Sequence, residues 1–202
     1  MVPFDLTRLE DRRLEAALLK IDLHAHSFPL EYLERLRHYY PDEIELREAP
    51  DGSQIGAWVK RRLPGVPVWD GQLRLSEIER DEVTMEVLSS PLMYTFVDEH
   101  SPELCRLMND TLAAECRRAP ECLRAFAHLP FNDMSAALAE LSRAVDELGC
   151  IGVLVTSNLA GRYLHTPEFE PFWAEVNRRR LPVFMHPSDP PQSYDDETST
   201  LL

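Results

Sequence analysis

Ile21-Asp22-Leu23-His24-Ala25-His26 places two histidines two positions apart at the end of a short apolar run. Successive side chains of a β-strand alternate between its faces, so the rings of His24 and His26 are expected close together on one face. Neutral imidazole nitrogen is a preferred ligand for Zn²⁺ and its first-row neighbours. A His-x-His pair also arises by chance on protein surfaces. Here Phe28-Pro29 turns the chain directly afterwards, which predicts a metal site at the carboxyl end of a strand, where α/β folds build their sites.

The rest of the chain alternates between helical and strand-like segments. Apolar spacing and turn residues predict helices over 30–40, 74–81, 101–119, 134–148 and from 166, and strands over 19–23, 84–89, 124–129, 150–155 and 181–185. The nearly continuous apolar run at 150–155 is typical of a parallel strand that is buried on both faces. The alternation therefore predicts an α/β fold with right-handed helical crossovers, either a doubly wound open sheet or a barrel.

His186 stands at the tip of the fifth predicted strand. In a barrel, the ends of strands that are distant in sequence converge on one face, so His186 would meet His24 and His26 there. An open sheet does not require these strands to come together, so the metal hypothesis favours the barrel. A single histidine after an apolar run is more often a capping or surface residue. His128, inside the third predicted strand, is expected to be a hydrogen-bonded core residue.

Composition bounds the class of protein. The 202 residues are enough for one domain with a sizeable core, and a net charge of −14 repels nucleic acid and anionic membrane surfaces. The four cysteines show no Cys-x-x-Cys spacing, which predicts reduced thiols and a cytoplasmic protein. No apolar run resembles a signal peptide or approaches the ~18 residues of a membrane span.

Several segments together resemble the amidohydrolase superfamily, and within it the branch of aminocarboxymuconate-semialdehyde decarboxylase and γ-resorcylate decarboxylase. His-x-His is weakly specific alone, but its combination with the His-Pro after the fifth strand and the Leu-Pro after the third is strong. The resemblance covers nearly the whole chain after residue 20. It is carried by Lys20 to His26, Arg74 to Pro91, Asn109 to Pro130, Ala139-Glu140-Leu141, Gly149 to Val155 and Pro182 to Pro187.

The resemblance implies a (β/α)₈ TIM-type barrel that holds one divalent metal, with His24, His26 and His186 as ligands. Zn²⁺ is the expected ion and Mn²⁺ the alternative. The resemblance also implies a homo-oligomer, a small carboxylic acid as substrate, and a place near the substrate entrance for Trp69, beside Asp70. Phe28 is a second candidate for substrate binding, because it follows the first strand and could line a pocket for a flat ring; ordinary loop packing explains it equally well.

The chain also departs from the family pattern. Family members supply a further histidine from strand six and an aspartate from strand eight, and neither position exists within these 202 residues. About five of eight strands are recognisable, whereas such barrels typically need ~250 residues. We therefore expect residues 1–202 to be a single domain, the amino-terminal portion of a barrel. An irregular insertion is expected over 41–70 and a loop after strand five over 188–202, and no catalytic residue is assigned.

Two reactions suit such a metal scaffold. The resemblance favours nonoxidative decarboxylation of a small cyclic or unsaturated carboxylic acid. Hydrolysis of a small cyclic ester, lactone or amide is the alternative, because a bound cation lowers the pKa of water from 15.7 to about 7. A third hypothesis, from a different class, is a noncatalytic barrel fragment that acts as a binding module through its exposed sheet edge.

Overall fold

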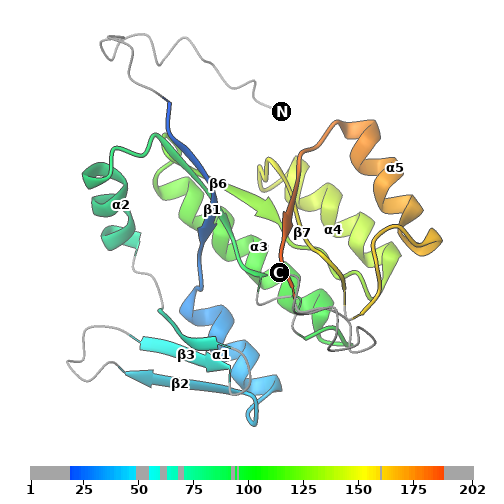
Figure 1. Cartoon of the computed structure of the whole chain (residues 1–202), viewed down its shortest axis with the longest axis horizontal. Coiled ribbons are helices and arrows are strands. Elements are labelled where there is room, and N and C mark those ends of the chain that lie inside the picture. The colour runs from blue at the N-terminus through cyan, green and yellow to red at the C-terminus, as the bar shows by residue number, and fades with distance from the viewer. Residues whose placement is uncertain are drawn as a thin grey trace, which may run out of the picture.

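The computed structural model describes residues 19–48, 55–59, 63–67, 71–91, 94, 96–159 and 161–188. Within these ranges, five parallel strands form one sheet in the order β1-β5-β6-β7-β8 (Figure 1). The strands are β1 (Ile21–His26), β5 (Met85–Ser89), β6 (Leu123–Ala127), β7 (Gly152–Thr156) and β8 (Val183–His186). This order is their order along the chain, as in a barrel wall in which each strand pairs with the next.

Helices connect consecutive strands of this sheet. They are α1 (Leu30–Tyr39), α2 (Gly71–Arg80), α3 (Ser101–Arg118), α4 (Met134–Asp146) and α5 (Glu170–Arg179), the last preceded by the 3₁₀ turn η3 (Pro167–Phe169). Asp133 caps α4 by accepting the Ala136 N–H (3.0 Å). The predicted alternation of helices and strands is confirmed, with element bounds shifted by a few residues. No helix of the described residues is long and apolar enough to cross a bilayer.

The five-stranded sheet curls. In a flat sheet, β1 and β8 would be separated by four strand spacings of about 4.8 Å, or roughly 19 Å. Instead the ring centroids of His24 on β1 and His186 on β8 lie 4.8 Å apart. The sheet is therefore a partial barrel wall, and the predicted barrel architecture is confirmed for the part of the chain that is described.

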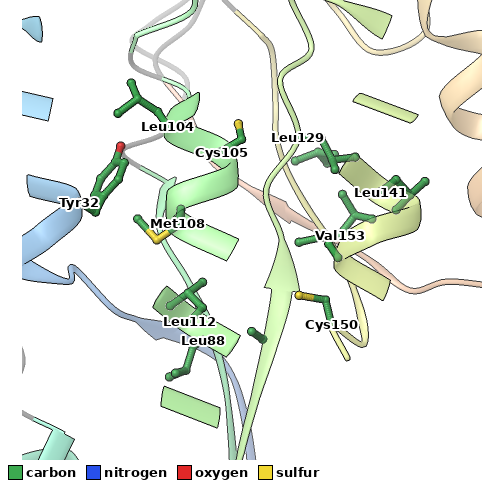
Figure 2. Packing of buried hydrophobic residues seen from close by; sticks show 14 of the residues in the cluster. Tyr32, Leu88, Leu104, Cys105, Met108, Leu112, Leu129, Leu141, Cys150 and Val153 are labelled. Atoms are coloured by element: carbon green, nitrogen blue, oxygen red, sulfur yellow. The ribbon is translucent and has the colours of Figure 1, made fainter. Parts of the chain in front are cut away.

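The apolar core has two unequal parts. The larger cluster lies between the sheet and its helices, where α3 buries Leu104, Cys105, Met108 and Leu112 and α4 buries Leu141 (Figure 2). The smaller cluster, on the other face of the sheet, consists of Val87, Phe126 and Leu154 with Tyr94, Ile151 and Phe184 packed against it. All four cysteines are free thiols, as the sequence predicts.

The described part of segment 41–70 is mostly β-strand. Three strands, β2 (Ile44–Glu48), β3 (Ile55–Val59) and β4 (Leu63–Pro67), form an antiparallel sheet in the order β2-β3-β4 next to α1 (Figure 1). The expectation of an irregular segment over 41–70 is therefore wrong for its described part. Gly56 and the two prolines of β4 disfavour strands in isolation, and cross-strand pairing overrides that local preference.

The two edge strands leave apolar side chains in contact with solvent. Leu23 on β1 is 48% exposed and Met185 on β8 is 54% exposed, and Leu19 and Ile21 are similarly open. Strand edges with unpaired backbone groups and exposed apolar side chains are sites where further strands or other chains pair.

Candidate metal centre

The centre is built from two strands at opposite edges of the curled sheet. His24 and His26 lie on β1 and His186 ends β8. The register between β1 and β5 shifts between Asp22 and Ala25, which is the mark of a β-bulge. Bulges re-aim side chains near active sites. The three rings gather at the carboxyl ends of the strands, with centroids 4.7 Å (His24 to His26), 4.8 Å (His24 to His186) and 5.1 Å (His26 to His186) apart.

The nitrogen atoms of these rings lie close together. One ring nitrogen from each histidine lies within 4.8 Å of the others. Nε2 of His26 is 3.4 Å from Nε2 of His186. Two nitrogens that bind one Zn²⁺ tetrahedrally at about 2.0–2.1 Å are themselves about 3.4 Å apart. His26 and His186 therefore stand at the spacing of two ligands of one ion, and the role of all three rings as ligands stays a prediction.

The hydrogen bonds leave lone pairs available. Nδ1 of His186 lies 2.7 Å from the carbonyl of Pro187, a contact that needs the proton on Nδ1 and leaves the Nε2 lone pair free. Nδ1 of His26 is buried and has no hydrogen-bond partner among the described residues. A metal ion held by Nε2 of His26 and Nε2 of His186 would replace the contact between these two nitrogens (3.4 Å) and would leave the bond of His186 Nδ1 to the Pro187 carbonyl in place.

Electrostatics keep two of the rings neutral. Burial and, to a smaller extent, the neighbouring rings of His186 and His24 together lower the pKa of His26 to about 4, against opposing effects of the Ser89 backbone and Asp22. Burial also lowers the pKa of His186, assisted by His24 and opposed by the Pro187 carbonyl. A neutral imidazole is the form that binds a metal, so these two rings need not lose a proton at neutral pH to do so.

Asp22 acts on the backbone of β1. Its Oδ1 accepts the N–H of His24 (2.8 Å), which is a hydrogen bond to the backbone of the strand that carries both histidines. Sequence reasoning missed Arg74, whose guanidinium donates to the carbonyl of His26 (2.5 Å). No local pattern links these two residues, because 48 positions separate them.

The candidates for substrate binding have different outcomes. Phe28 is 4% exposed and belongs to the larger core cluster, with its ring centroid 5.8 Å from that of His26. Trp69 lies outside the described residues.

His128 is the predicted core histidine. It is fully buried, and its Nε2 accepts the N–H of Ser90 (2.9 Å). Across the described residues, the one group that could hold a metal is His24, His26 and His186.

Known proteins resemble this chain in sequence and in fold. The chain matches the amidohydrolase family over residues 21–200. It is 35% identical to a γ-resorcylate decarboxylase of Rhizobium radiobacter over 140 residues, which are 66% of this chain and 43% of that enzyme. The chain spans about half the length of the curated relatives it matches.

Several solved structures have a similar fold. A 2,6-dihydroxybenzoate decarboxylase, solved with 2,6-dihydroxybenzoate, superposes with a TM-score of 0.68 at 25% identity, over 92% of this chain and 55% of that one. A dihydroxybenzoic acid decarboxylase of Polaromonas, solved with manganese and 2-nitroresorcinol, superposes with a TM-score of 0.66 at 23% identity, over 91% of this chain and 53% of that one. By the extent of its sequence match, the chain belongs to the amidohydrolase family.

Proposed function

We propose that this chain supplies the metal centre of a metal-dependent, nonoxidative decarboxylase that acts on small aromatic or unsaturated carboxylic acids. The observation that carries the proposal is the convergence of three imidazoles from opposite edges of the sheet on one point. The family match and the decarboxylases among the relatives supply the reaction class.

The residues present fit a divalent metal ion. His24, His26 and His186 would hold it, since their nitrogens are close enough and two of the rings are held neutral by burial. Imidazole suits Zn²⁺, and Mn²⁺ is the ion in the related Polaromonas structure. We propose Zn²⁺ first and Mn²⁺ as the alternative.

The face of the sheet beneath the centre suits a flat apolar ring. The ring centroids of Phe184 and His24 are 5.4 Å apart. The ring of Phe126 stacks on that of Phe184, with centroids 5.5 Å apart and planes at 6°. Val87 and Leu154 complete this buried apolar layer. An apolar layer below polar ligands orients an aromatic acid with its charged groups toward the imidazoles.

A bound metal ion would supply charge stabilisation for the oxygen atoms of the substrate. Loss of CO₂ from a ring carbon also requires a positioned group that delivers a proton to that carbon. By the family resemblance we expect that group on strands after the fifth, so we assign no proton donor within residues 19–188. We propose that a complete active site needs the remaining strands of the barrel.

Two experiments test this function. Purified chain should retain one equivalent of Zn²⁺ or Mn²⁺, and His24→Ala, His26→Ala and His186→Ala should each lose it, while His38→Ala, a change of an exposed histidine on α1, should keep it. The full-length protein, with all strands of the barrel, should release CO₂ from 2,6-dihydroxybenzoate as a probe substrate, and His24→Ala should abolish this release.

The outcomes separate the alternatives. Hydrolysis of lactones or cyclic amides without CO₂ release would overturn the decarboxylase and favour the hydrolase. Absence of metal from the wild-type chain, combined with association through its sheet edges, would favour a noncatalytic binding module, because Leu23 and Met185 are exposed there. We further propose a cytoplasmic homo-oligomer that does not bind nucleic acid, in keeping with the net charge of −14.

A further inference from the structure

The end of β1 is fastened by side chains that come from other elements. Nη2 of Arg74 on α2 donates to the backbone carbonyl of His26 (2.5 Å), and Nη1 of the same guanidinium lies 2.5 Å from Oε2 of Glu86 on β5. Ser27, the next residue, donates its N–H to the carbonyl of Ser89 (2.9 Å) and its hydroxyl to Glu115 on α3 (3.0–3.1 Å). The peptide that follows the His26 ring is therefore bonded on both sides.

The Arg74 side chain that makes these contacts is buried. Its side chain is only 6% exposed, and that of Glu86 is 14% exposed. A buried guanidinium is costly unless it is paired, and a planar fork is suited to hold two acceptors at once. Burial raises the pKa of the nearby Glu115 carboxyl, against the opposing effects of the Ser27 hydroxyl and the Arg74 charge. The Glu86 carboxylate pairs with Nη1 of Arg74, and Nη2 of the same side chain bonds the His26 carbonyl.

The ladder between β1 and β5 is irregular in the middle of the strand. Its register shifts between Asp22 and Ala25, and pairing resumes with Ala25 opposite Leu88 and His26 opposite Ser89, so the bonds of Arg74 and Ser27 add to a ladder that restarts only at this end. The direction of the His26 carbonyl sets the backbone angle next to the ring. That angle decides whether Nε2 of His26 points at Nε2 of His186, as it does at 3.4 Å.

We propose that Arg74 is a positioning residue of the metal centre, which holds the His26 carbonyl and thereby aims the His26 ring at the shared ion. The inference rests on the proposed metal function. It assigns a role to a side chain that touches neither the ion nor the substrate. Partners of this kind typically change metal affinity by 10- to 100-fold when they are removed.

The test is a double-mutant cycle on the 202-residue chain with Zn²⁺ alone as the probe. Zn²⁺ affinity is measured by competition with a chromophoric chelator for the wild type, Arg74→Lys, His26→Ala and the double variant. Lysine keeps the positive charge beside Glu86 but cannot hold both acceptors as a fork. Arg74→Met is measured in parallel wherever circular dichroism shows a folded chain.

We expect Arg74→Lys to weaken Zn²⁺ binding about 10- to 100-fold. In the His26→Ala background, which does not retain Zn²⁺ through purification but binds added Zn²⁺ weakly through His24 and His186, Arg74→Lys should cause no further loss of affinity, because the effect passes through the His26 ring. Arg80→Met, an exposed position on the same helix that pairs with Asp81, should bind like the wild type.

Each remaining result overturns the inference. If Arg74→Lys binds Zn²⁺ as tightly as the wild type, or weakens both backgrounds equally, Arg74 does not act through His26 and the positioning role is wrong while the metal centre stands. If the wild-type chain binds no Zn²⁺, the proposed metal centre fails, and the positioning role fails with it.

Discussion

Nε2 of His26 lies 3.4 Å from Nε2 of His186, although 160 positions of the chain separate the two residues. The contact depends on the curvature of a sheet whose first and last strands carry these rings. Any change that flattens or shears the sheet should therefore weaken metal binding even where it touches neither histidine.

Gly152 provides such a change at the start of β7. A Cβ at this position would lie 2.5 Å from the carbonyl oxygen of Pro182 and 3.1 Å from the ring of Phe126. That carbonyl accepts the Val153 N–H (3.0 Å), the bond that begins the pairing of β7 with β8. We expect Gly152→Ala to destabilise the fold by about 1–3 kcal/mol through overpacking and to weaken Zn²⁺ binding, because β8 carries His186.

Urea unfolding and chelator competition measure these two effects. Gly149→Asn is a control without overpacking, since nothing lies within 4 Å of a Cβ added at Gly149. Its φ of +80° makes any side chain there strained, and asparagine tolerates this conformation better than most residues, so it should lower stability slightly and leave Zn²⁺ binding unchanged. Wild-type stability and affinity in Gly152→Ala would show that the sheet absorbs the extra methyl group.

Asn109 on α3 joins the helix to the end of β6. Its Nδ2 donates to the His128 carbonyl (2.9 Å) and to Glu140 (2.7 Å), and its Oδ1 accepts the His128 N–H (2.8 Å). Asn109→Ala removes the partner of the His128 carbonyl and of the His128 N–H, each at a cost of about 1–3 kcal/mol, whereas Glu140 keeps its bonds to Arg143. We expect a total loss of roughly 2–4 kcal/mol, measured by chemical denaturation. Asn177→Ala, at an exposed position of α5, should change stability by less than about 0.5 kcal/mol.

His128 should make the folded state less stable at acidic pH. Burial lowers its pKa to about 3, from 6.5, against opposing backbone hydrogen bonds. Between these two pH values the unfolded chain binds more protons than the folded chain, so stability is complete above pH 6.5 and falls as the pH drops toward 3. At about 1.4 kcal/mol per pKa unit, the contribution amounts to roughly 3 kcal/mol between pH 6.5 and pH 4.

Urea midpoints of the wild type and His128→Gln across pH 4–7 measure this dependence. Glutamine keeps an acceptor for the Ser90 N–H but does not titrate. The difference between the two pH dependences is the contribution of His128, because the carboxylates contribute equally to both proteins. Equal pH dependences would contradict a lowered pKa of His128.

The exposed sheet edges predict self-association of the isolated chain. Leu23 and Met185 are about half exposed on the two edge strands, and such edges pair with other chains. We expect Leu23→Lys combined with Met185→Lys to shift the chain toward the monomer in light scattering. Leu75→Lys, at a partly exposed position on α2, should leave the association unchanged. A wild-type chain that is monomeric at high concentration would refute this expectation.

Much of the architecture follows from sequence periodicity. The 150–155 run and the repeat in 134–148 predict β7 and α4 because burial on two faces, or on one helical face, leaves a regular apolar pattern. The convergence of His186 with the His-x-His pair also follows, since barrel closure brings distant strand ends together. The assignment of the three histidines as ligands stays a prediction.

Features that depend on tertiary contacts were not predictable. The β2-β3-β4 sheet was missed because glycine and proline mask strand preference there. The role of Arg74 was missed because a helix residue 48 positions away meets the His26 carbonyl only after folding. The β1 bulge left no signal in the alternation that predicted the pair.

The unequal division of the apolar core has a consequence for how such a protein can change. Most of the buried side chains lie between the sheet and its helices, and only a small cluster lies beneath the imidazoles. Substitutions beneath the imidazoles therefore remove only a minor share of the packing free energy. Side chains on that face can change by mutation while the scaffold stays folded.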